Sequence, residues 1–279
     1  MTIRPGDTGA PVKELQRTLN NLGSMLLLDG QFGPSTSDAV TAARQTLGMP
    51  GPVEVDEAFQ TKLQSVPDLF PPLTASGVTF IARAEVGSAK QYRLHSQPCL
   101  PSATSGITIG IGYDCQFVTR DRLFTDWAGQ LSDAVLDRIA GCVGVVGSQS
   151  LLRPLLDLQV PLGAAMTVFA TRSLRDFLDQ TRSIYPEIDG LDEARRTALV
   201  SIVYNRGHRL TDKDLQRHDR LEMRNIQDLL KTGHMDSVAD QIDAMARLWG
   251  PGPTPSSGLV ERRHAEASLW RGGFAAVQL

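Results

Sequence analysis

The stretch Ser105-Gly-Ile-Thr-Ile-Gly-Ile-Gly-Tyr-Asp114 decides how most of this chain is interpreted. Its isoleucines alternate with small or polar residues, and Gly110 and Gly112 stand on either side of Ile111. Alternation with a period of two is typical of a strand with one buried face. The stretch therefore predicts a short, half-buried strand or hairpin that ends in a carboxylate, Asp114, which stays solvated and ionised.

A second carboxylate, Glu85, closes the segment Val78–Glu85, whose apolar residues recur at helical spacing. We expect this carboxyl at a helix end beside packed apolar surface, and partial burial favours the protonated form of a carboxyl. Glycosidic cleavage needs a protonated acid at the leaving oxygen and a second carboxylate that activates water or attacks the sugar. Glu85 and Asp114 fit these two roles.

Thr108 completes the pattern, because it follows Glu85 by 23 residues and precedes Asp114 by 6. Glu85, Thr108 and Asp114 in this order resemble the catalytic residues of the pesticin family, bacterial toxins whose C-terminal domain resembles phage-type lysozyme. In the phage lysozymes the Asp precedes the Thr, so the pesticin branch is the closer match. Residues 198–207 and 258–270 are similar to the buried central helix and the C-terminal helix of phage-type lysozymes, so the resemblance spans roughly residues 72 to 275.

The resemblance implies a mainly α (α+β) lysozyme-like fold with a small β-hairpin lobe, and muramidase activity on peptidoglycan. By that resemblance Glu85 is the general acid, Asp114 positions or deprotonates the attacking water, and Thr108 hydrogen-bonds that water. Phage-type lysozymes are regarded as inverting, which requires carboxyl groups roughly 6.5 to 9.5 Å apart, whereas about 5 Å suits a retaining nucleophile. The sequence leaves this choice open.

Two arginines of the C-terminal helix, Arg262 and Arg263, would lie near the catalytic glutamate in this family. One of them would pair with Glu85 and stabilise its ionised form. The alternative is that both are surface arginines that pair with Glu261 or Glu266.

Ser201, Tyr204 and Asn205 of the central helix are candidates to reach the cleft. Ser201 and Tyr204 share a face, and core packing is the simpler role for Tyr204. Asn205 is the better candidate for a polar cleft residue. Asn205 and Arg263 are therefore the expected substrate-binding residues.

The first 66 residues predict a separate three-helix module. Leucines at spacings of three and four predict a first helix, and further helices are expected from Pro34 or Ser35 and over Asp56 to Leu63. GDTGAPVKELQRTLNNLG and the loop Asp29–Gly33 with Thr36 are similar to the peptidoglycan-binding domain 1 family. Ala43 and Arg44 stand where that family usually has an aromatic-Gln pair, and Ser24 replaces a frequent Tyr.

The expected domains are residues 1–66, a linker over 67–74 and a catalytic domain over 75–279. The linker is expected because three prolines lie between Ser65 and Thr74, where they disfavour helix. Apolar periodicity in the catalytic domain predicts helices over residues 119–143, 163–178, 192–206, 221–232 and 236–249.

Composition limits the partners. The 279 residues are 41% hydrophobic and contain no apolar run long enough to cross a membrane, so no membrane insertion is expected. A net charge of −3 without a long Lys/Arg run argues against nucleic acid. Five histidines without metal-ligand spacing predict no metal site and no cofactor. Peptidoglycan is the expected partner.

The start of the chain lacks a basic segment followed by an apolar core, so no secretory signal is expected. A protein made in the cytoplasm would then reach the periplasm and wall after release by a holin, as an endolysin, or by injection, as an antibacterial effector. An effector implies a secretion-machine component and a periplasmic immunity protein as further partners.

Three cysteines cannot all pair within one molecule. Cys99 and Cys115 flank the predicted hairpin, and either a disulfide there or two buried free thiols fits the sequence. Three other functions stay open. A lytic transglycosylase needs one Glu only, an inactive wall-binding protein would need none of these side chains, and a chitinase would act on a related backbone.

Overall fold

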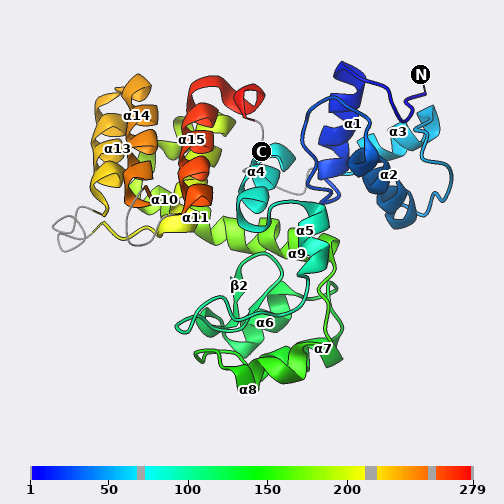
Figure 1. The fold of residues 1–279 in the computed structure, drawn as a ribbon, viewed down its shortest axis with the longest axis horizontal. Helices are drawn as coiled ribbons and strands as arrows, with labels where there is room; N and C mark the ends of the chain where they lie inside the picture. Colours follow the sequence, from blue (N-terminus) through cyan, green and yellow to red (C-terminus); the bar gives the residue numbers. More distant parts are fainter. Residues whose placement is uncertain (1, 68–72, 211–218, 251–255, 278–279) are drawn as a thin grey trace. The chain divides into compact units, whose positions relative to one another are not determined.

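The computed structural model describes residues 2–67, 73–210, 219–250 and 256–277 (Figure 1). The chain divides into two compact units, Met1–Ser173 and Leu174–Leu279. The described residues are mainly helical, with one two-stranded antiparallel sheet. The expected class, mainly α with a small hairpin lobe, is confirmed and is consistent with a lysozyme-like fold.

The N-terminal part of the first unit is a three-helix module, as expected. Its helices are α1 (Ala10–Asn20), α2 (Pro34–Thr46) and α3 (Glu57–Gln64). Val12, Leu15 and Leu19 recur along one face of α1 and are buried in the core that the three helices share. Asp56 caps α3 by accepting a hydrogen bond from the Phe59 N–H at 2.8 Å. The apolar residues at spacings of three and four in the sequence therefore form the core face of α1.

The rest of the first unit joins short helices around one hairpin. Its elements are α4 (Ala75–Val86), α5 (Ala89–Leu94), β1 (Thr108–Ile109), β2 (Tyr113–Asp114), η1 (Cys115–Phe117), α6 (Arg120–Asp126), α7 (Asp133–Ala140), α8 (Gln149–Leu152), η2 (Arg153–Leu155), α9 (Leu162–Val168) and the π-helical η3 (Phe169–Ser173). The single helix expected over 119–143 is wrong. It breaks between α6 and α7 because Gly129 adopts a φ of 72°, which an α-helix cannot contain.

The N-terminal module packs against α4 within this unit. Helix α1 contacts α4, and the Arg83 Nη1 donates to the Met25 carbonyl at 3.0 Å. Burial lowers the pKa of the Arg83 guanidinium. The predicted linker runs partly through residues 68–72, which lie outside the described residues. The boundary near residue 70 therefore stays a prediction.

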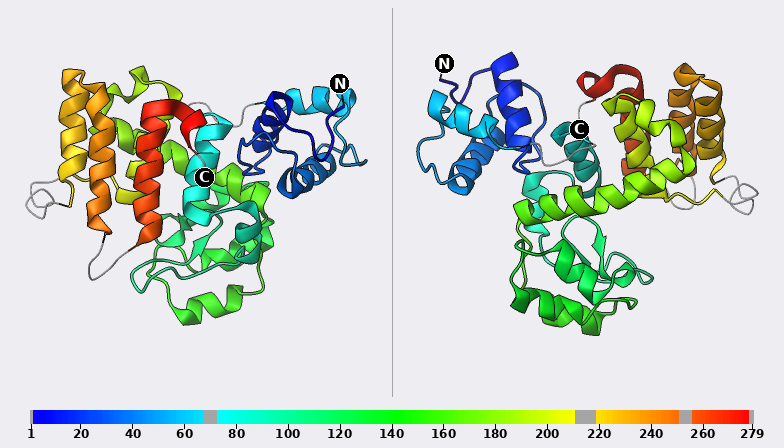
Figure 2. Two further views of the ribbon diagram at one scale, coloured as in Figure 1. Left: turned by 45° about the horizontal axis from the view of Figure 1, so that its top comes forward. Right: turned by 180° about the vertical axis from the view of Figure 1, so that it is seen from behind.

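The second unit is a helical bundle. Its elements are α10 (Leu174–Ile184), η4 (Pro186–Gly190), α11 (Glu193–Arg206), α13 (Leu221–Thr232), η5 (Met235–Ser237), α14 (Val238–Ala244), η6 (Met245–Leu248), α15 (Ser257–Gly272) and η7 (Gly273–Ala276). Helices α13, α14 and α15 lie side by side (Figure 2), and α15 also packs on α11. The helices expected over 192–206 and 221–232 are confirmed, whereas 236–249 begins and ends in 3-10 turns.

Candidate functional site

The hairpin brings Thr108 and Asp114 together. The two residues are directly opposite each other in the register of β1 and β2, and Ile109 is opposite Tyr113. Residues opposed in an antiparallel pair point to the same face, with Cβ atoms about 4.5 to 5.5 Å apart. Thr108 and Asp114 are half-buried, whereas Ile109 and Tyr113 on the other face are buried. The half-buried hairpin expected from the sequence is therefore confirmed, with both polar side chains on its accessible face.

Thr108 is also fixed by a third chain segment. The Thr108 N–H donates to the Cys99 carbonyl at 2.8 Å, and the Cys99 N–H donates to the Thr108 carbonyl at 2.9 Å. Thr108 thus lies between Cys99 and Asp114 in a small ladder. The Thr108 hydroxyl is therefore attached to a backbone that pairs with Cys99 on one side and Asp114 on the other.

Asp114 is oriented by two backbone amides. Its Oδ1 accepts from the Gln116 N–H at 2.9 Å, and its Oδ2 accepts from the Gly106 N–H at 3.2 Å. The first bond caps η1, which gives the carboxylate a structural role. A carboxylate has about four lone-pair positions, so two hydrogen bonds leave capacity for a water molecule or a sugar hydroxyl. The same geometry therefore serves both folding and chemistry.

Gly106 permits this arrangement. A Cβ atom at position 106 would lie 2.2 Å from the Asp114 Oδ1 and 2.6 Å from the Gln116 nitrogen. Neither the capping amide nor the carboxylate can move away without losing its hydrogen bond. Only glycine fits at this position.

The buried side of the hairpin packs on an aromatic ring and is hydrogen-bonded to a carboxylate. The Tyr113 ring meets Trp127 edge to face, with 5.5 Å between ring centroids. The Tyr113 hydroxyl donates to the Asp126 Oδ2 at 3.0 Å, and the Arg122 Nε donates to the same oxygen at 2.8 Å. Burial, together with the Asp126 carboxylate, raises the pKa of Tyr113. The sequence analysis did not identify Asp126, the last residue of α6, or Trp127, which follows it.

Glu85 lies in the last turn of α4, in the same unit as the hairpin. It is exposed, so the expected partial burial is wrong. Buried positions run through the first part of α4 to Ala82, and Arg83 and Ala84 are already half-exposed. The helix therefore leaves the core before it reaches Glu85. The pairing of Glu85 with the hairpin residues stays a prediction.

Arg262 and Arg263 are buried in the second unit rather than on its surface. The Arg263 Nη2 and the Arg262 Nε donate to the Glu266 Oε1 at 2.8 and 3.2 Å. The Ser201 Oγ donates to the same oxygen at 2.5 Å. The expected pairing with Glu266 is therefore present, but the expected surface location is wrong, because α15 packs between α11 and α14.

Ser201 is fully buried in this cluster, so its predicted place in a cleft is wrong. Tyr204 packs on Phe177, with 4.5 Å between ring centroids, but both rings are half-buried rather than in the core. Asn205 is half-buried, and its Oδ1 is a buried acceptor that receives no hydrogen bond within the described residues. Of the three, Asn205 is the one with an acceptor that a ligand could use.

All three cysteines are free thiols. Cys99 is exposed, which contradicts the interpretation of Cys99 and Cys115 as two buried thiols. Cys115 and Cys142 are buried. Burial, with smaller effects from Cys142 and Asp114, raises the pKa of the Cys115 thiol to about 12. Cys115 is therefore an uncharged core residue next to Asp114.

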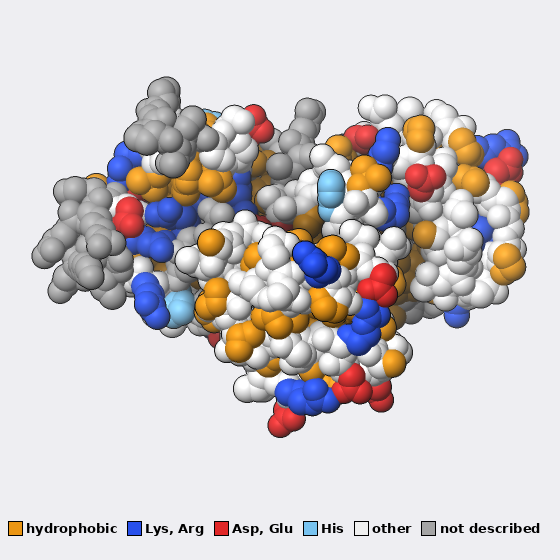
Figure 3. Space-filling view, turned by 60° about the horizontal axis from the view of Figure 1, so that its bottom comes forward, with side chains coloured by type: hydrophobic (Ala, Val, Ile, Leu, Met, Phe, Trp, Pro, Cys, Tyr) orange, Lys and Arg blue, Asp and Glu red, His pale blue; other side chains and the backbone are white. Residues whose placement is uncertain are grey.

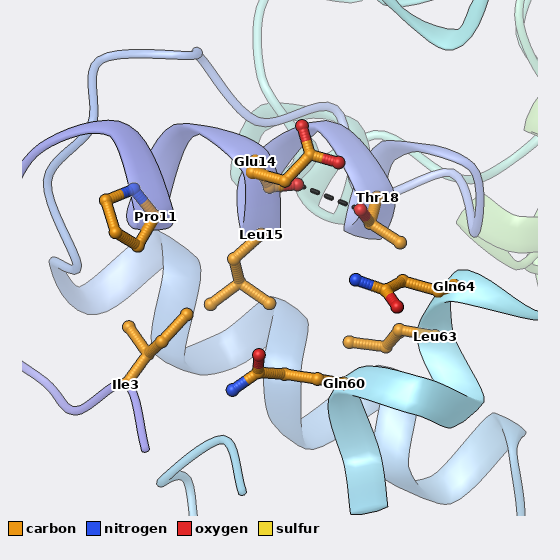
Figure 4. Close-up of a pocket in the computed structure, with 8 residues that line it drawn as sticks. All are labelled: Ile3, Pro11, Glu14, Leu15, Thr18, Gln60, Leu63 and Gln64. Carbon is orange, nitrogen blue, oxygen red and sulfur yellow. Dashed lines mark hydrogen bonds between the residues drawn. The ribbon is translucent and has the colours of Figure 1, made fainter. Parts of the chain in front are cut away.

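The N-terminal module contains a small pocket between α1 and α3 (Figure 4). Its residues surround an apolar floor with polar groups, and they are Ile3, Pro11, Glu14, Leu15, Thr18, Gln60, Leu63 and Gln64. Its volume of about 40 Å³ is far below the 300 Å³ or more that is typical of ligand pockets. A sugar ring does not fit inside this pocket.

Packing explains one departure from the family pattern, Arg44, and one feature that matches it, the loop Asp29–Gly33. The Arg44 guanidinium lies 4.2 Å from the centroid of the Phe59 ring, and its Nη2 donates to the Glu54 carbonyl at 2.7 Å. Loop Asp29–Gly33 is held by Gln16, which bonds to the Asp29 Oδ1 at 2.7 Å. Arg44 is therefore a core residue of this module.

Neither a metal cluster nor a membrane-spanning helix is present in the described ranges. No group of three or more His, Cys, Asp or Glu side chains there is arranged to hold a metal ion. Among the helices described, none combines the length and the apolar character that crossing a membrane requires.

Comparison with known proteins identifies the N-terminal module. Residues 8–53 match the family described as putative peptidoglycan binding domain. No curated protein matches the chain. The match supports a cell-wall-binding module with peptidoglycan as its partner.

Proposed function

We propose that this chain is a peptidoglycan hydrolase that cleaves the β-1,4 bond between N-acetylmuramic acid and N-acetylglucosamine. The Thr108–Asp114 pair on the accessible face of the hairpin is the observation that carries the proposal. The peptidoglycan-binding match at residues 8–53 supports a substrate in the cell wall.

In this mechanism Glu85 protonates the leaving oxygen as general acid. The Asp114 carboxylate is already oriented by two amides, and its remaining lone pairs accept a proton from the attacking water. The Thr108 hydroxyl, on the same face, holds that water in position. Handling of water by Asp114 corresponds to an inverting reaction.

Arg263 and Asn205 have supporting roles in the proposal. Arg263, whose guanidinium bonds to the Glu266 carboxylate, stays in the proposal as a substrate-binding residue. The buried Asn205 Oδ1 suits an N–H or O–H donor of an N-acetylated sugar.

Digestion of purified peptidoglycan followed by mass spectrometry tests the proposal. The wild type should release muropeptides with reducing N-acetylmuramic acid ends, and Glu85→Gln should release none because it cannot donate the proton. Glu57→Gln, at an exposed glutamate of α3, is the matched control and should cleave as the wild type does. Anhydro ends would identify a lytic transglycosylase, and no release by the wild type would leave a wall-binding protein.

The route to the wall is part of the proposal. Periplasm-directed expression should lyse a Gram-negative host, whereas cytoplasmic expression alone should not. Lysis when a holin is added would fit an endolysin. Rescue by a small periplasmic protein encoded beside the gene would fit an injected effector and its immunity protein.

A further inference from the structure

The segments around the hairpin have an unusual surface composition. Asp114 is the sole charged residue in the range 96–119, and the range 139–152 has none, although 21% of the whole chain is charged. The polar side chains there include hydroxyl groups. The exposed Ser102 Oγ lies 2.7 Å from the Ser105 Oγ, to which it is hydrogen-bonded. Figure 3 shows exposed hydrophobic side chains gathered on the lobe that contains α6 to α8, with Lys, Arg, Asp and Glu side chains beside them.

Three apolar side chains are exposed on these two segments. Phe117, at the end of η1, is 77% exposed, and Val145 and Val146 are 44% and 51% exposed. Isolated exposed apolar residues are common, but these three belong to segments that lie next to the hairpin in the chain or are hydrogen-bonded to residues next to it.

Two hydrogen bonds hold the segment 139–152 against residues on either side of the Asp114 hairpin. The Gly144 N–H donates to the Cys115 carbonyl at 3.0 Å, and the Gly147 N–H donates to the Ser105 carbonyl at 2.9 Å. Val145 and Val146 are therefore held between two anchors on either side of the hairpin. Phe117 is held because the Asp114 carboxylate caps the turn that ends at Phe117.

We propose that the exposed Phe117, together with Val145 and Val146 of the segment bonded to Cys115, is a stacking platform for a sugar residue of an uncharged N-acetylated glycan next to the bond that is cleaved. A pyranose ring presents C–H groups that meet the negative face of an aromatic ring, and its hydroxyls bond to side chains such as Ser102. A charged peptide or a phosphate backbone would instead require opposite charges, which these segments lack. The inference rests on the proposed function and names the substrate contact of the same site.

Binding of a short chitin oligosaccharide, tetra-N-acetylchitotetraose, to the full chain tests the platform. All proteins carry Glu85→Gln so that turnover does not consume the ligand, and calorimetry gives the Kd. Phe117→Ala should raise the Kd about three- to tenfold, as expected for the loss of one aromatic contact. Phe117→Trp should keep the Kd near that of the parent. Leu94→Ala is the matched control, because Leu94 is 71% exposed at the end of α5.

The outcomes separate the platform from the proposed function. Equal Kd values for Phe117→Ala and Leu94→Ala, or no binding by the parent protein, would overturn the platform. Weaker binding by Phe117→Ala in a protein whose wild type releases no muropeptides would keep the platform and remove the hydrolase assignment. Thermal melting of each variant excludes loss of folding as the cause.

Discussion

Asp114 in the hairpin and Glu266 in the helical bundle are both carboxylates, but the structure holds them in opposite ways. Asp114 is half-buried and bonds to two backbone amides, in segments with no other charge. Glu266 is fully buried and bonds to Arg262, Arg263 and Ser201. Both residues belong to motifs from which the sequence predicts one lysozyme-like domain, so the motif alone does not define the role.

This difference indicates which of the two carboxylates is available for catalysis. The Glu266 carboxylate is bonded by buried guanidinium groups, and removal of one partner from such a cluster leaves an uncompensated buried charge. The amides that bond to Asp114 orient its carboxylate without neutralising it, and they leave lone pairs directed to solvent. We therefore expect Glu266 to control stability and Asp114 to control turnover.

Substitution of Glu266 should give the largest effect. Glu266→Ala removes the carboxylate that the two buried arginines share, so the free energy of unfolding should fall by about 3–5 kcal/mol. Glu261→Ala, at an exposed glutamate of the same helix, should change it by less than about 0.5 kcal/mol. Urea unfolding followed by circular dichroism measures both. Equal losses would contradict a structural role specific to Glu266.

Gly106→Ala should have the second-largest effect, and it should act on the hairpin. The added methyl group would lie 2.2 Å from the Asp114 Oδ1, so we expect a loss of about 1–3 kcal/mol together with most of the turnover. In Gly163→Ala a Cβ meets nothing within 4 Å, and stability should stay within about 0.5 kcal/mol. Melting temperatures and peptidoglycan turnover of the two variants give the comparison. A fully active Gly106→Ala would show that the orientation of Asp114 does not matter.

At neutral pH the smallest effect should come from Cys115, whose contribution to stability changes only at alkaline pH. Its pKa is raised to about 12 in the folded protein from an ordinary value of 9.0. This contribution is fully present below about pH 9 and is lost as the pH rises toward 12. The melting temperature should therefore fall over that range, and less steeply in Cys115→Ala than in the wild type. Gln97→Ala, at an exposed side chain that does not titrate, should retain the slope of the wild type, and identical slopes in all three proteins would refute the prediction.

Regular local patterns were predictable from the sequence. The spacing of Val12, Leu15 and Leu19 gave the buried face of α1, and the alternation of Ile107, Ile109 and Ile111 gave the buried face of the hairpin. These patterns succeed because each residue's environment follows from the period of its own element.

Features that depend on distant packing were not predictable. Nothing local distinguishes Arg263, which is fully buried, from an ordinary helix-surface arginine. Glu85 follows an apolar segment, but its exposure depends on where α4 leaves the core. The two amides on Asp114 come from Gly106 and Gln116, and their convergence requires the turn itself.

The stereochemistry of the first product tests the central claim most directly. Proton NMR of a soluble peptidoglycan oligosaccharide, recorded within minutes of adding the wild-type protein, distinguishes the anomer released before mutarotation. Handling of water by Thr108 and Asp114 predicts inversion, so the α-anomer should appear first. The β-anomer would make a carboxylate the nucleophile, and an unchanged substrate would remove the hydrolase assignment. Either of these two results would contradict the account.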